Sequence, residues 1–500
     1  MPTLFDLIAM NQADRPAVIV PESNARVTYG ALVGQVDVLA RQLASAGVDK
    51  GNRVAIAVPD ALPALVSVLA AATVGAAAPL NPAYREEEYR FYLKETTARA
   101  LIVPARDGGA ARRAAGTDVR VLTVDLDSSG STCTADAAAS RCGTPPCSVD
   151  DPALILYTSG STGCPKRVAL THANLSISAR NVARSYDLRP DDVSLCVMPL
   201  FHVHGLVASV LATFATGGTV ILPRRFNPMS FWRTAHEHGA TWYSAAPTIH
   251  QLALERLPSS VGASTARGCL RFVRACSAPL PMRLMRALED ALSVPVIEAY
   301  GLTEAAHQVA SNFLPPGIRK PGSVGTVAGV TIGVMDQAGS LLEFGRRGEV
   351  VVRGPNVITG YEDQPEANAA AFANGWFRTG DEGVLDSDGF LTLIGRTTEF
   401  INRGGEKISP REVEEALGEH PAVADAVCFG TAHRVWGEEV AAAVVLRTVA
   451  TESELVGHCR DRLADFKCPR RIVFVETLPK TPNGKTQRGV VARAFAGVLE

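Results

Sequence analysis

Short apolar runs rich in β-branched residues alternate along most of the chain with longer segments rich in Ala, Leu and Arg. Clear examples of the runs are residues 53–58, 100–103 and 219–222, which read RVAIAV, ALIV and TVIL. Continuous apolar runs of this length predict buried strands, and the longer segments between them predict helices. The alternation therefore predicts an α/β fold whose sheets are largely buried.

Two stretches interrupt the alternation. Residues 125–150 are rich in Ser, Thr, Ala, Gly and Pro, so they predict an exposed loop before a strand over residues 153–157. Residues 61–80 carry no charge, but they contain two prolines, Gly75 and many alanines. Such a segment buries too little apolar surface to predict a membrane span, so we interpret it as a buried helix.

The final hundred residues form a separate pattern. A helix is expected over residues 410–418, and strands are expected over residues 424–429, 440–446 and 471–475. A chain of 500 residues is also too long for one hydrophobic core. We therefore predict a large domain over residues 1–396 and a small α+β domain over residues 397–500.

The charge balance excludes some classes of partner. The chain has 49 Lys and Arg against 51 Asp and Glu, so its formal charge of −2 gives no general attraction for nucleic acid or an anionic membrane. The ten cysteines form no CxxC pair, and the first residues contain no basic leader. We therefore expect a cytoplasmic globular protein with reduced thiols, small-molecule partners and no membrane span.

The strongest local motif is residues 157–166, YTSGSTGCPK, directly after a predicted strand. Glycines let backbone N–H groups approach phosphate oxygens, hydroxyls donate further hydrogen bonds, and the lysine supplies a positive charge. Taken alone, a Ser/Thr/Gly run is as often a flexible turn, and this one is not the GxxxxGK[ST] P-loop. We interpret the segment as a polyphosphate-binding loop formed by Thr158, Ser159, Gly160, Ser161, Thr162, Gly163 and Lys166.

This loop resembles the phosphate loop of the adenylate-forming superfamily, which contains acyl-CoA synthetases, luciferases and the adenylation domains of peptide synthetases. Further motifs follow in the family's order, namely AYGLTE (299–304), GE (348–349), WFRTGD (376–381), GR (395–396), GGEKISP (404–410) and PKTPNGK (479–485). The resemblance covers nearly the whole chain. It implies a large N-terminal domain of stacked β-sheets with flanking helices and a small mobile C-terminal domain. The implied activity is ATP-dependent conversion of a carboxylic acid to an acyl-adenylate, followed by transfer to coenzyme A.

The resemblance also implies roles for individual residues. Thr303 would contact the α-phosphate, and Glu304 would hold Mg²⁺, a hard cation that prefers oxygen ligands. Tyr300 would stack on adenine, Asp381 would accept both ribose hydroxyls, and Arg396 would reach ribose or phosphate. Without the other motifs, Asp381 and Glu304 would pass for a turn residue and a helix N-terminal charge. The remaining residues expected to bind ATP or CoA are Ser277, Ala278, Pro279, Gly301, Gly404, Gly405 and Lys407.

Lys485 would be the family's mobile lysine, which offsets charge in the adenylation transition state and then leaves as the small domain rotates. The hinge for that rotation maps to Thr398, where relatives usually carry Asp or Lys. Arg167 stands where Gly usually follows the Pro-Lys of the phosphate loop. These departures keep open an acceptor other than CoA, such as an amine, a carrier protein or an inorganic nucleophile. A catalytically silent homologue is disfavoured, because Lys166, Glu304, Asp381, Arg396 and Lys485 are all present.

Residues 198–205, MPLFHVHG, bear on which acid the protein binds. Amino-acid-activating relatives carry here an Asp that pairs with the substrate amine, whereas this chain carries His202, so an amino acid is disfavoured. The local motifs are most similar to those of the oxalyl-CoA synthetase branch. That similarity implies a short polar acid, with oxalate as the first candidate. It would be recognised by His202, His250, Ser277 and His307. Ala275, where that branch is expected to have a hydroxyl, keeps an aromatic or medium-chain acid open.

Overall fold

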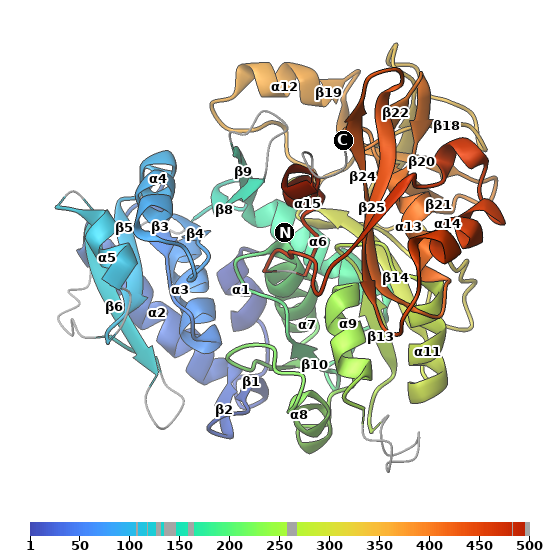
Figure 1. Cartoon of the computed structure of the whole chain (residues 1–500). Coiled ribbons are helices and arrows are strands. Elements are labelled where there is room, and N and C mark those ends of the chain that lie inside the picture. The colour runs from blue at the N-terminus through green and yellow to red at the C-terminus, as the bar shows by residue number, and fades with distance from the viewer. Residues whose placement is uncertain are drawn as a thin grey trace.

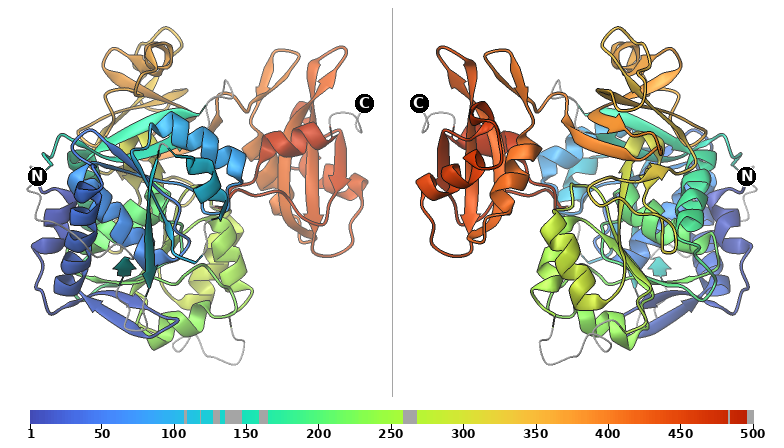
Figure 2. Two further views of the ribbon diagram at one scale, coloured as in Figure 1. Left: turned by 90° about the vertical axis from the view of Figure 1, so that its left-hand side faces the viewer. Right: turned by 90° about the vertical axis from the view of Figure 1, so that its right-hand side faces the viewer.

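The computed structural model describes residues 1–106, 109–117, 119–126, 132–134, 147–158, 165–257, 268–482 and 484–495. These parts form a large body and a smaller C-terminal lobe (Figure 1). Figure 2 shows the lobe, coloured orange to red, projecting from one side of the body. The α/β fold with a small α+β C-terminal unit is therefore confirmed.

The central sheet of the large domain contains nine strands in the order β16-β15-β14-β13-β12-β10-β11-β1-β2. The six strands from β14 to β1 are parallel; β2 is antiparallel to β1 at one edge, and β15 is antiparallel to both of its neighbours, β14 and β16, toward the other. The strands are β1 (Pro16–Val20), β2 (Ala25–Thr28), β10 (Val193–Cys196), β11 (Thr219–Ile221), β12 (Trp242–Ala245), β13 (Phe272–Ala275), β14 (Val296–Leu302), β15 (His307–Ser311) and β16 (Thr326–Val327).

A second sheet of seven strands has the order β7-β6-β5-β3-β4-β8-β9. Its last two strands, β8 and β9, are antiparallel neighbours, and the predicted phosphate loop connects them. The strands are β3 (Arg53–Ile56), β4 (Ala76–Pro79), β5 (Ala100–Pro104), β6 (Arg120–Leu126), β7 (Thr132–Thr134), β8 (Pro152–Thr158) and β9 (Lys166–Thr171).

Helices pack between and around these two sheets. Leu32, Leu65, Leu175 and Leu206, from α2, α3, α6 and η1, belong to one continuous buried cluster that includes strands of both sheets. Helix α3 is apolar on all sides, as expected for a helix enclosed by protein. The helices are α1 (Leu4–Ala9), α2 (Tyr29–Ser45), α3 (Ala61–Val74), α4 (Glu86–Thr96), α5 (Gly109–Ala115), α6 (His172–Ser185), the π-helical turn η1 (His204–Leu211), α7 (Ala212–Phe214), α8 (Phe231–Glu237), α9 (Pro247–Leu254), α11 (Met282–Leu292) and the 3₁₀ turn η2 (Thr303–Ala305).

A third sheet carries the TGD and GR motifs toward the small domain. Its strands have the order β17-β18-β20-β19, and β21 pairs with the other part of β20. In that pair Asp381 lies opposite Arg396. The elements are β17 (Thr331–Met335), β18 (Arg347–Arg353), α12 (Pro365–Ala371), β19 (Phe372–Ala373), β20 (Trp376–Leu385) and β21 (Leu391–Arg396).

The small domain has its own sheet and its own apolar core. The sheet has the order β23-β22-β25-β24, with β26 parallel to β25. Its core packs α13 and α14 against the sheet. The elements are β22 (Ile401–Arg403), β23 (Glu406–Ile408), α13 (Pro410–Gly418), β24 (Val423–His433), β25 (Gly437–Leu446), α14 (Glu452–Arg460), the 3₁₀ turn η3 (Asp465–Lys467), β26 (Arg471–Phe474) and α15 (Arg488–Phe495).

Two local predictions differ from the structure. The helix expected over residues 61–80 ends at Val74, and β4 follows. A Cβ on Gly75 would lie only 2.6 Å from the Asn52 carbonyl oxygen, so this glycine allows the close turn into a strand between β3 and β8. The loop expected from residue 125 contains β7, which pairs with the end of β6, while residues 127–131 and 135–146 lie outside the described parts. None of the described helices is long and apolar enough to cross a membrane.

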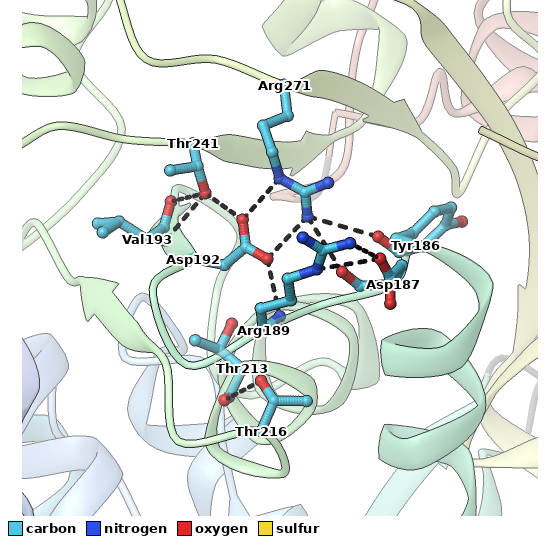
Figure 3. A network of polar contacts seen from close by, with 9 residues as sticks. All are labelled: Tyr186, Asp187, Arg189, Asp192, Val193, Thr213, Thr216, Thr241 and Arg271. Atoms are coloured by element: carbon cyan, nitrogen blue, oxygen red, sulfur yellow. Dashed lines mark hydrogen bonds and ion pairs between the residues drawn. The ribbon is translucent and has the colours of Figure 1, made fainter. Parts of the chain in front are cut away.

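A half-buried ion pair joins the amino ends of three strands of the central sheet. Asp192, Thr241 and Arg271 immediately precede β10, β12 and β13, at the amino ends of these parallel strands (Figure 3). The Asp192 carboxylate accepts bonds of 2.8 and 2.7 Å from Arg271, and one of 2.7 Å from the Thr241 hydroxyl. This network connects the strands at their amino ends, and the candidate site lies at their carboxyl ends.

Candidate active site

The site motifs meet at the carboxyl ends of the parallel strands. The segments that follow β10, β12, β13 and β14 begin at Val197, Ala246, Cys276 and Thr303. Loops at this edge of an α/β sheet commonly form the ligand-binding crevice. The sequence motifs are therefore brought together by strand topology although they are up to a hundred residues apart.

Tyr300, Asp381 and Arg396 form a contiguous group on β14, β20 and β21. The Tyr300 hydroxyl donates to Asp381 Oδ2, and Arg396 Nε lies 3.0 Å from Asp381 Oδ1. The Asp381 carboxylate raises the pKa of Arg396, and burial followed by Asp381 raises the pKa of Tyr300 well above its usual value. Asp381 is thus a buried acceptor with a donor on each oxygen, and Gly301 directly follows Tyr300 on the same strand.

Glu304 lies on the turn η2, directly after Thr303, and receives two hydroxyl groups on the same oxygen. Tyr361 donates to Glu304 Oε1 over 2.9 Å, and Thr158 donates to it over 3.3 Å. Lys166 Nζ lies 4.8 Å from the centre of the Tyr361 ring. The beginning and end of the phosphate loop are therefore held beside Glu304. Ser159, Gly160, Ser161, Thr162 and Gly163 lie outside the described residues.

Arg167 is held by carboxylates and a carbonyl. Its Nη2 lies 2.7 Å from Asp363 Oδ2, its Nε lies 3.2 Å from Glu362 Oε2, and its Nη1 donates to the Glu95 carbonyl over 2.5 Å. Arg53 pairs with the other oxygen of Glu362. The arginine that replaces the family's glycine therefore joins β9 to the segment after β18, where its charge is already paired.

Lys485 lies close to Asp381 and Arg396, which together with Tyr300 are called the nucleotide group below, in this arrangement of the two domains. Burial and then Arg396 lower its pKa, whereas Glu399 and Asp381 raise it. The preceding Gly484 packs against the large domain, because a Cβ there would lie 2.0 Å from the Thr248 hydroxyl. The structure therefore brings Lys485, which is 185 residues from Tyr300 in the sequence, into the electrostatic surroundings of Asp381 and Arg396.

A cluster of histidines and serines lies beside the nucleotide group. His204 Nδ1 is 2.7 Å from Ser277 Oγ, and His204 Nε2 is 2.7 Å from Ser244 Oγ. The His204 and His307 rings stack with centres 5.2 Å apart. Ser277 and His307 have φ of +74° and +107°, a strained region for residues other than glycine that is typical of functional sites. Ala278 and Pro279 continue the loop from Ser277 toward α11.

Arg274 forms the base of this cluster and is completely buried. Its guanidinium donates to Ser244 Oγ (2.9 Å), Tyr186 Oη (2.8 Å) and Gln308 Oε1 (2.8 Å), and Nη2 lies 3.0 Å from His307 Nε2. Within the described residues, no carboxylate forms an ion pair with Arg274. Burial and then Arg274 hold the pKa of His204 and of His307 well below the usual range, so both rings are neutral. The cluster is therefore a buried cation surrounded by neutral groups.

His202 and His250 lie differently from each other. His202 packs on Phe201, with ring centres 4.7 Å apart, and burial lowers its pKa to about 4. His250 has both ring nitrogens beside protein partners, Tyr243 Oη at 3.3 Å and the Arg274 carbonyl at 3.2 Å. It is fully buried, and within the described residues it has no hydrogen bond or ring contact to Ser277 or His307, so it lies outside the group that those residues form with His204.

Gly404, Gly405 and Lys407 lie on the β22–β23 hairpin of the small domain. The Gly404 N–H donates to the Trp436 carbonyl over 2.8 Å, and the Gly405 N–H donates to Asn402 Oδ1 over 3.2 Å. The hairpin is largely exposed around these residues. In this domain arrangement it is Lys485, and not the hairpin, that lies beside Asp381 and Arg396.

Sequence reasoning missed three residues of the site. His204 lies in the segment MPLFHVHG but was not predicted as a site residue, and neither Arg274 nor Tyr361 belongs to a recognised motif. Arg274 had one usable signal, since it is a charged residue inside the otherwise apolar strand β13. Tyr361 had none, because its role depends on contacts between distant segments.

A cavity of about 1100 Å³ lies between the large domain and the segment that leads from Lys480 to Lys485, called the lysine loop below. Its walls include Met198–Phe201, Pro247–Ile249, Gln251 and Leu252 of the large domain and Lys480–Pro482 of the small domain, and they are mainly apolar. Arg224 and Arg225 are among its lining residues and are largely exposed. Arg224 is paired with Asp60, and Glu255, Asp425 and Lys480 also line the cavity, so its rim carries charges of both signs. The cavity is wide enough for a long flexible ligand.

Comparisons with known proteins agree with this arrangement. The model of the AMP-binding enzyme family matches residues 5–362, and that of the AMP-binding enzyme C-terminal domain matches residues 412–485. The chain is 41% identical to the oxalate–CoA ligase of Arabidopsis thaliana, over 98% of each chain. It is 37% identical to the sulfoacetate–CoA ligase of Cupriavidus necator, over 97% of this chain and 96% of that one.

Solved structures give the same family. ATP-bound MatB from Rhodopseudomonas palustris superimposes with a TM-score of 0.90 at 29% identity, covering 100% of this chain and 99% of that one. O-succinylbenzoate coenzyme A synthetase from Bacillus subtilis, in complex with ATP and magnesium ion, superimposes with a TM-score of 0.85 at 29% identity, covering 98% and 99%. The chain therefore belongs to the AMP-binding enzyme family, as a member of the AMP-forming acid:CoA ligases.

Proposed function

We propose that this enzyme activates a short acid with a second negative charge, oxalate in the first place, and transfers the acyl group to coenzyme A. The proposal rests on the surroundings of Arg274, which is fully buried and has no ion pair with a carboxylate among the described residues. An uncompensated buried charge is costly unless a partner of opposite sign is supplied. A distal carboxylate placed beside His204, Ser277 and His307 would supply that charge close to Arg274.

The same cluster disfavours other acids. A substrate without a second negative group would leave the buried Arg274 guanidinium without a counter-charge, and sites that bury an unmatched charge discriminate strongly. An amino acid would bring its ammonium group toward Arg274 and find no carboxylate there. The similarity to ligases named for oxalate and sulfoacetate, both short dianions, supports the same class of acid.

The nucleotide group is proposed to bind ATP. Asp381 would exchange its contacts with Tyr300 and Arg396 for the ribose hydroxyls, Tyr300 would stack on adenine, and Lys166 would face the β- and γ-phosphates. Ser277 to Pro279 and Gly301 would border the nucleotide. Thr303 would contact the α-phosphate, and Thr158 with residues 159–163 would complete the phosphate loop.

The surroundings of Glu304 fit a Mg²⁺ ion bound together with ATP. Both hydroxyl donors use Oε1, and in the described residues Oε2 has no hydrogen bond or ion pair. A carboxylate oxygen beside triphosphate oxygens is the ligand set that Mg²⁺ prefers. When bound, the ion would neutralise charge on the phosphates and on the departing pyrophosphate.

Adenylation requires a carboxylate to approach a negatively charged α-phosphate. The acid's oxygen forms a bond to phosphorus while the bond to pyrophosphate breaks, which leaves an acyl-adenylate. Lys485 is proposed to donate hydrogen bonds to both anions during this step, which lowers the barrier through charge placed in advance. In the second step the CoA sulfur forms the thioester, and AMP leaves with the electron pair of the broken C–O bond.

The proposed acceptor is coenzyme A. Its pantetheine arm is long and weakly polar, which suits the cavity beside the lysine loop, and its phosphates suit the arginine-bearing rim. Gly404, Gly405 and Lys407 are proposed to contact CoA after the small domain has rotated. A small amine acceptor would not need an apolar channel of this length.

The proposed hinge is Thr398, between domains assigned to residues 1–396 and 397–500. The Thr397 N–H and hydroxyl both bond to the Gly380 carbonyl of the large domain, at 2.9 and 3.1 Å. Glu399 Oε2 lies 3.2 Å from Arg488 Nε of the small domain. Thr398 thus lies between Thr397, which is bonded to the large domain, and Glu399, which contacts both domains because its N–H donates to the Arg396 carbonyl over 3.0 Å.

The test of this function replaces the proposed charge without changing the nucleotide group. Arg274→Gln keeps two hydrogen-bond donors but removes the cation, so the KM for oxalate should rise by about tenfold or more while the KM for ATP changes little. The matched control is Arg271→Gln, which removes a guanidinium at the amino end of the same strand, β13. An unchanged KM for oxalate in Arg274→Gln would exclude recognition of the distal carboxylate by this charge.

A further inference from the structure

Tyr361 connects two parts of the candidate nucleotide site that come from distant segments. It lies between β18 and α12, and only 5% of its surface is exposed. Its hydroxyl donates to Glu304 Oε1 over 2.9 Å, while Lys166 Nζ lies 4.8 Å from the centre of its ring. One side chain therefore contacts both a carboxylate and an ammonium group that face the phosphate loop.

The backbone of Tyr361 is fixed by a side chain of α12. The Tyr361 N–H donates to Asn368 Oδ1 over 2.6 Å, and Asn368 Nδ2 donates back to the Tyr361 carbonyl over 2.8 Å. Two bonds in opposite directions from one amide define both the position and the orientation of the peptide. The ring is thus set by α12 before any ligand binds.

The residues after Tyr361 attach this segment to β9. The Glu362 N–H donates to the Arg167 carbonyl over 3.2 Å, and Gln364 Nε2 donates to the Pro165 carbonyl over 3.3 Å. Arg167 adds its ion pairs to Glu362 and Asp363. The end of the phosphate loop and Tyr361 therefore form one unit, in which the arginine that replaces the usual glycine is a structural tie.

We propose that Tyr361 is a positioning residue that sets the distance and direction between Glu304 and Lys166. The proposal rests on the proposed function, in which Glu304 holds Mg²⁺ and Lys166 faces the β- and γ-phosphates. Its hydroxyl fixes Oε1 of a side chain that otherwise has three rotatable bonds, and so presents Oε2 toward the triphosphate.

The ring has a different task at Lys166. A carboxylate beside the lysine would neutralise its charge, and in the described residues Lys166 has no ion pair. An aromatic face attracts the ammonium group through the ring quadrupole but leaves its three N–H donors available. Tyr361 thus restrains the lysine and preserves its charge for phosphate.

Two substitutions separate the tasks. Tyr361→Phe keeps the ring and removes the hydroxyl, whereas Tyr361→Leu removes both. The control is Tyr29→Phe, which removes an equally buried hydroxyl, bonded over 2.7 Å to the Gly218 carbonyl far from the nucleotide group. ATP binding is measured by calorimetry, with Mg²⁺ and with EDTA, so that the readout does not depend on turnover or on the identity of the acid.

Tyr361→Phe should reduce the tightening of ATP binding by Mg²⁺ by about tenfold, since a hydrogen bond to a charged group is lost, and leave the affinity in EDTA unchanged. Tyr361→Leu should in addition weaken binding in EDTA by about threefold, the effect of losing a cation–π contact. Tyr29→Phe should match the parent in both. Equal Mg²⁺ tightening in Tyr361→Phe and the parent would overturn the proposal. A parent that binds no ATP under either condition would instead overturn the proposed function, and this proposal with it.

Discussion

Glu298 allows a pH prediction whose size follows from its surroundings. It lies on β14, two residues before Tyr300, and it is 5% exposed. Burial raises its pKa from 4.5 to about 7, while the Gly322 N–H, which donates to Oε2 over 3.1 Å, and Arg411 act in the opposite direction and Glu415 raises it further. Arg411 and Glu415 belong to α13, so the carboxyl group faces the small domain.

The direction in which stability changes with pH follows from proton binding by Glu298. The folded protein holds this proton more tightly than the unfolded chain, so burying the carboxyl costs nothing below about pH 4.5 and stability is lost as the pH rises through about 7. The interval corresponds to on the order of 3 kcal/mol at full ionisation. Glu298→Gln keeps an acceptor for Gly322 and removes the titration.

The assay is urea unfolding of parent and Glu298→Gln at about pH 5 and about pH 8.5. The free energy of unfolding of the variant, relative to the parent, should rise by about 2 to 3 kcal/mol between these two values. A difference that stays constant with pH would show that the carboxyl ionises as freely in the folded protein as in the unfolded chain. The assigned burial under the small domain would then be wrong.

The other predictions concern the half-reactions. Lys485→Ala should abolish adenylate formation, followed as pyrophosphate release, but largely spare thioester formation from a supplied acyl-adenylate; equal loss in both would refute the division of roles. Asp381→Ala should raise the KM for ATP by about 10- to 100-fold, from about 1.5 to 3 kcal/mol of hydrogen bonding; an unchanged KM would leave Asp381 a turn residue. Thr398→Pro should slow thioester formation more than adenylation, because proline fixes φ at the proposed pivot; an equal decrease would place the hinge elsewhere.

Local patterns were sufficient to predict much of the fold. Helix α13 begins and ends at the predicted residues 410 and 418, and strands β3, β5, β8 and β11 lie where apolar runs indicated them. These elements are short, continuous and bounded by turn residues, so local preference and burial agree. The family motifs then predicted which loops should meet.

The misses share a physical cause. Residues 76–79 are alanines and a proline, with no preference for a strand, and they form β4 only because β3 and β8 leave a narrow space between them. Arg274 is significant because none of the described carboxylates forms an ion pair with it, and the sequence alone cannot show which side chains surround a residue. His250 resembled a pocket residue, yet its two nitrogens are beside Tyr243 and the Arg274 carbonyl. Tertiary partners decided each of these cases.

The most direct test of the account is acid-dependent exchange between ATP and pyrophosphate, measured without CoA for oxalate, octanoate, palmitate and a cinnamate, and then thioester formation with CoA. The account predicts strong exchange with oxalate and poor exchange with octanoate, palmitate and the cinnamate. Oxalyl-CoA should form only when CoA is added. Exchange supported by cinnamate or octanoate and not by oxalate would contradict the role given to Arg274 and to the neutral cluster around it.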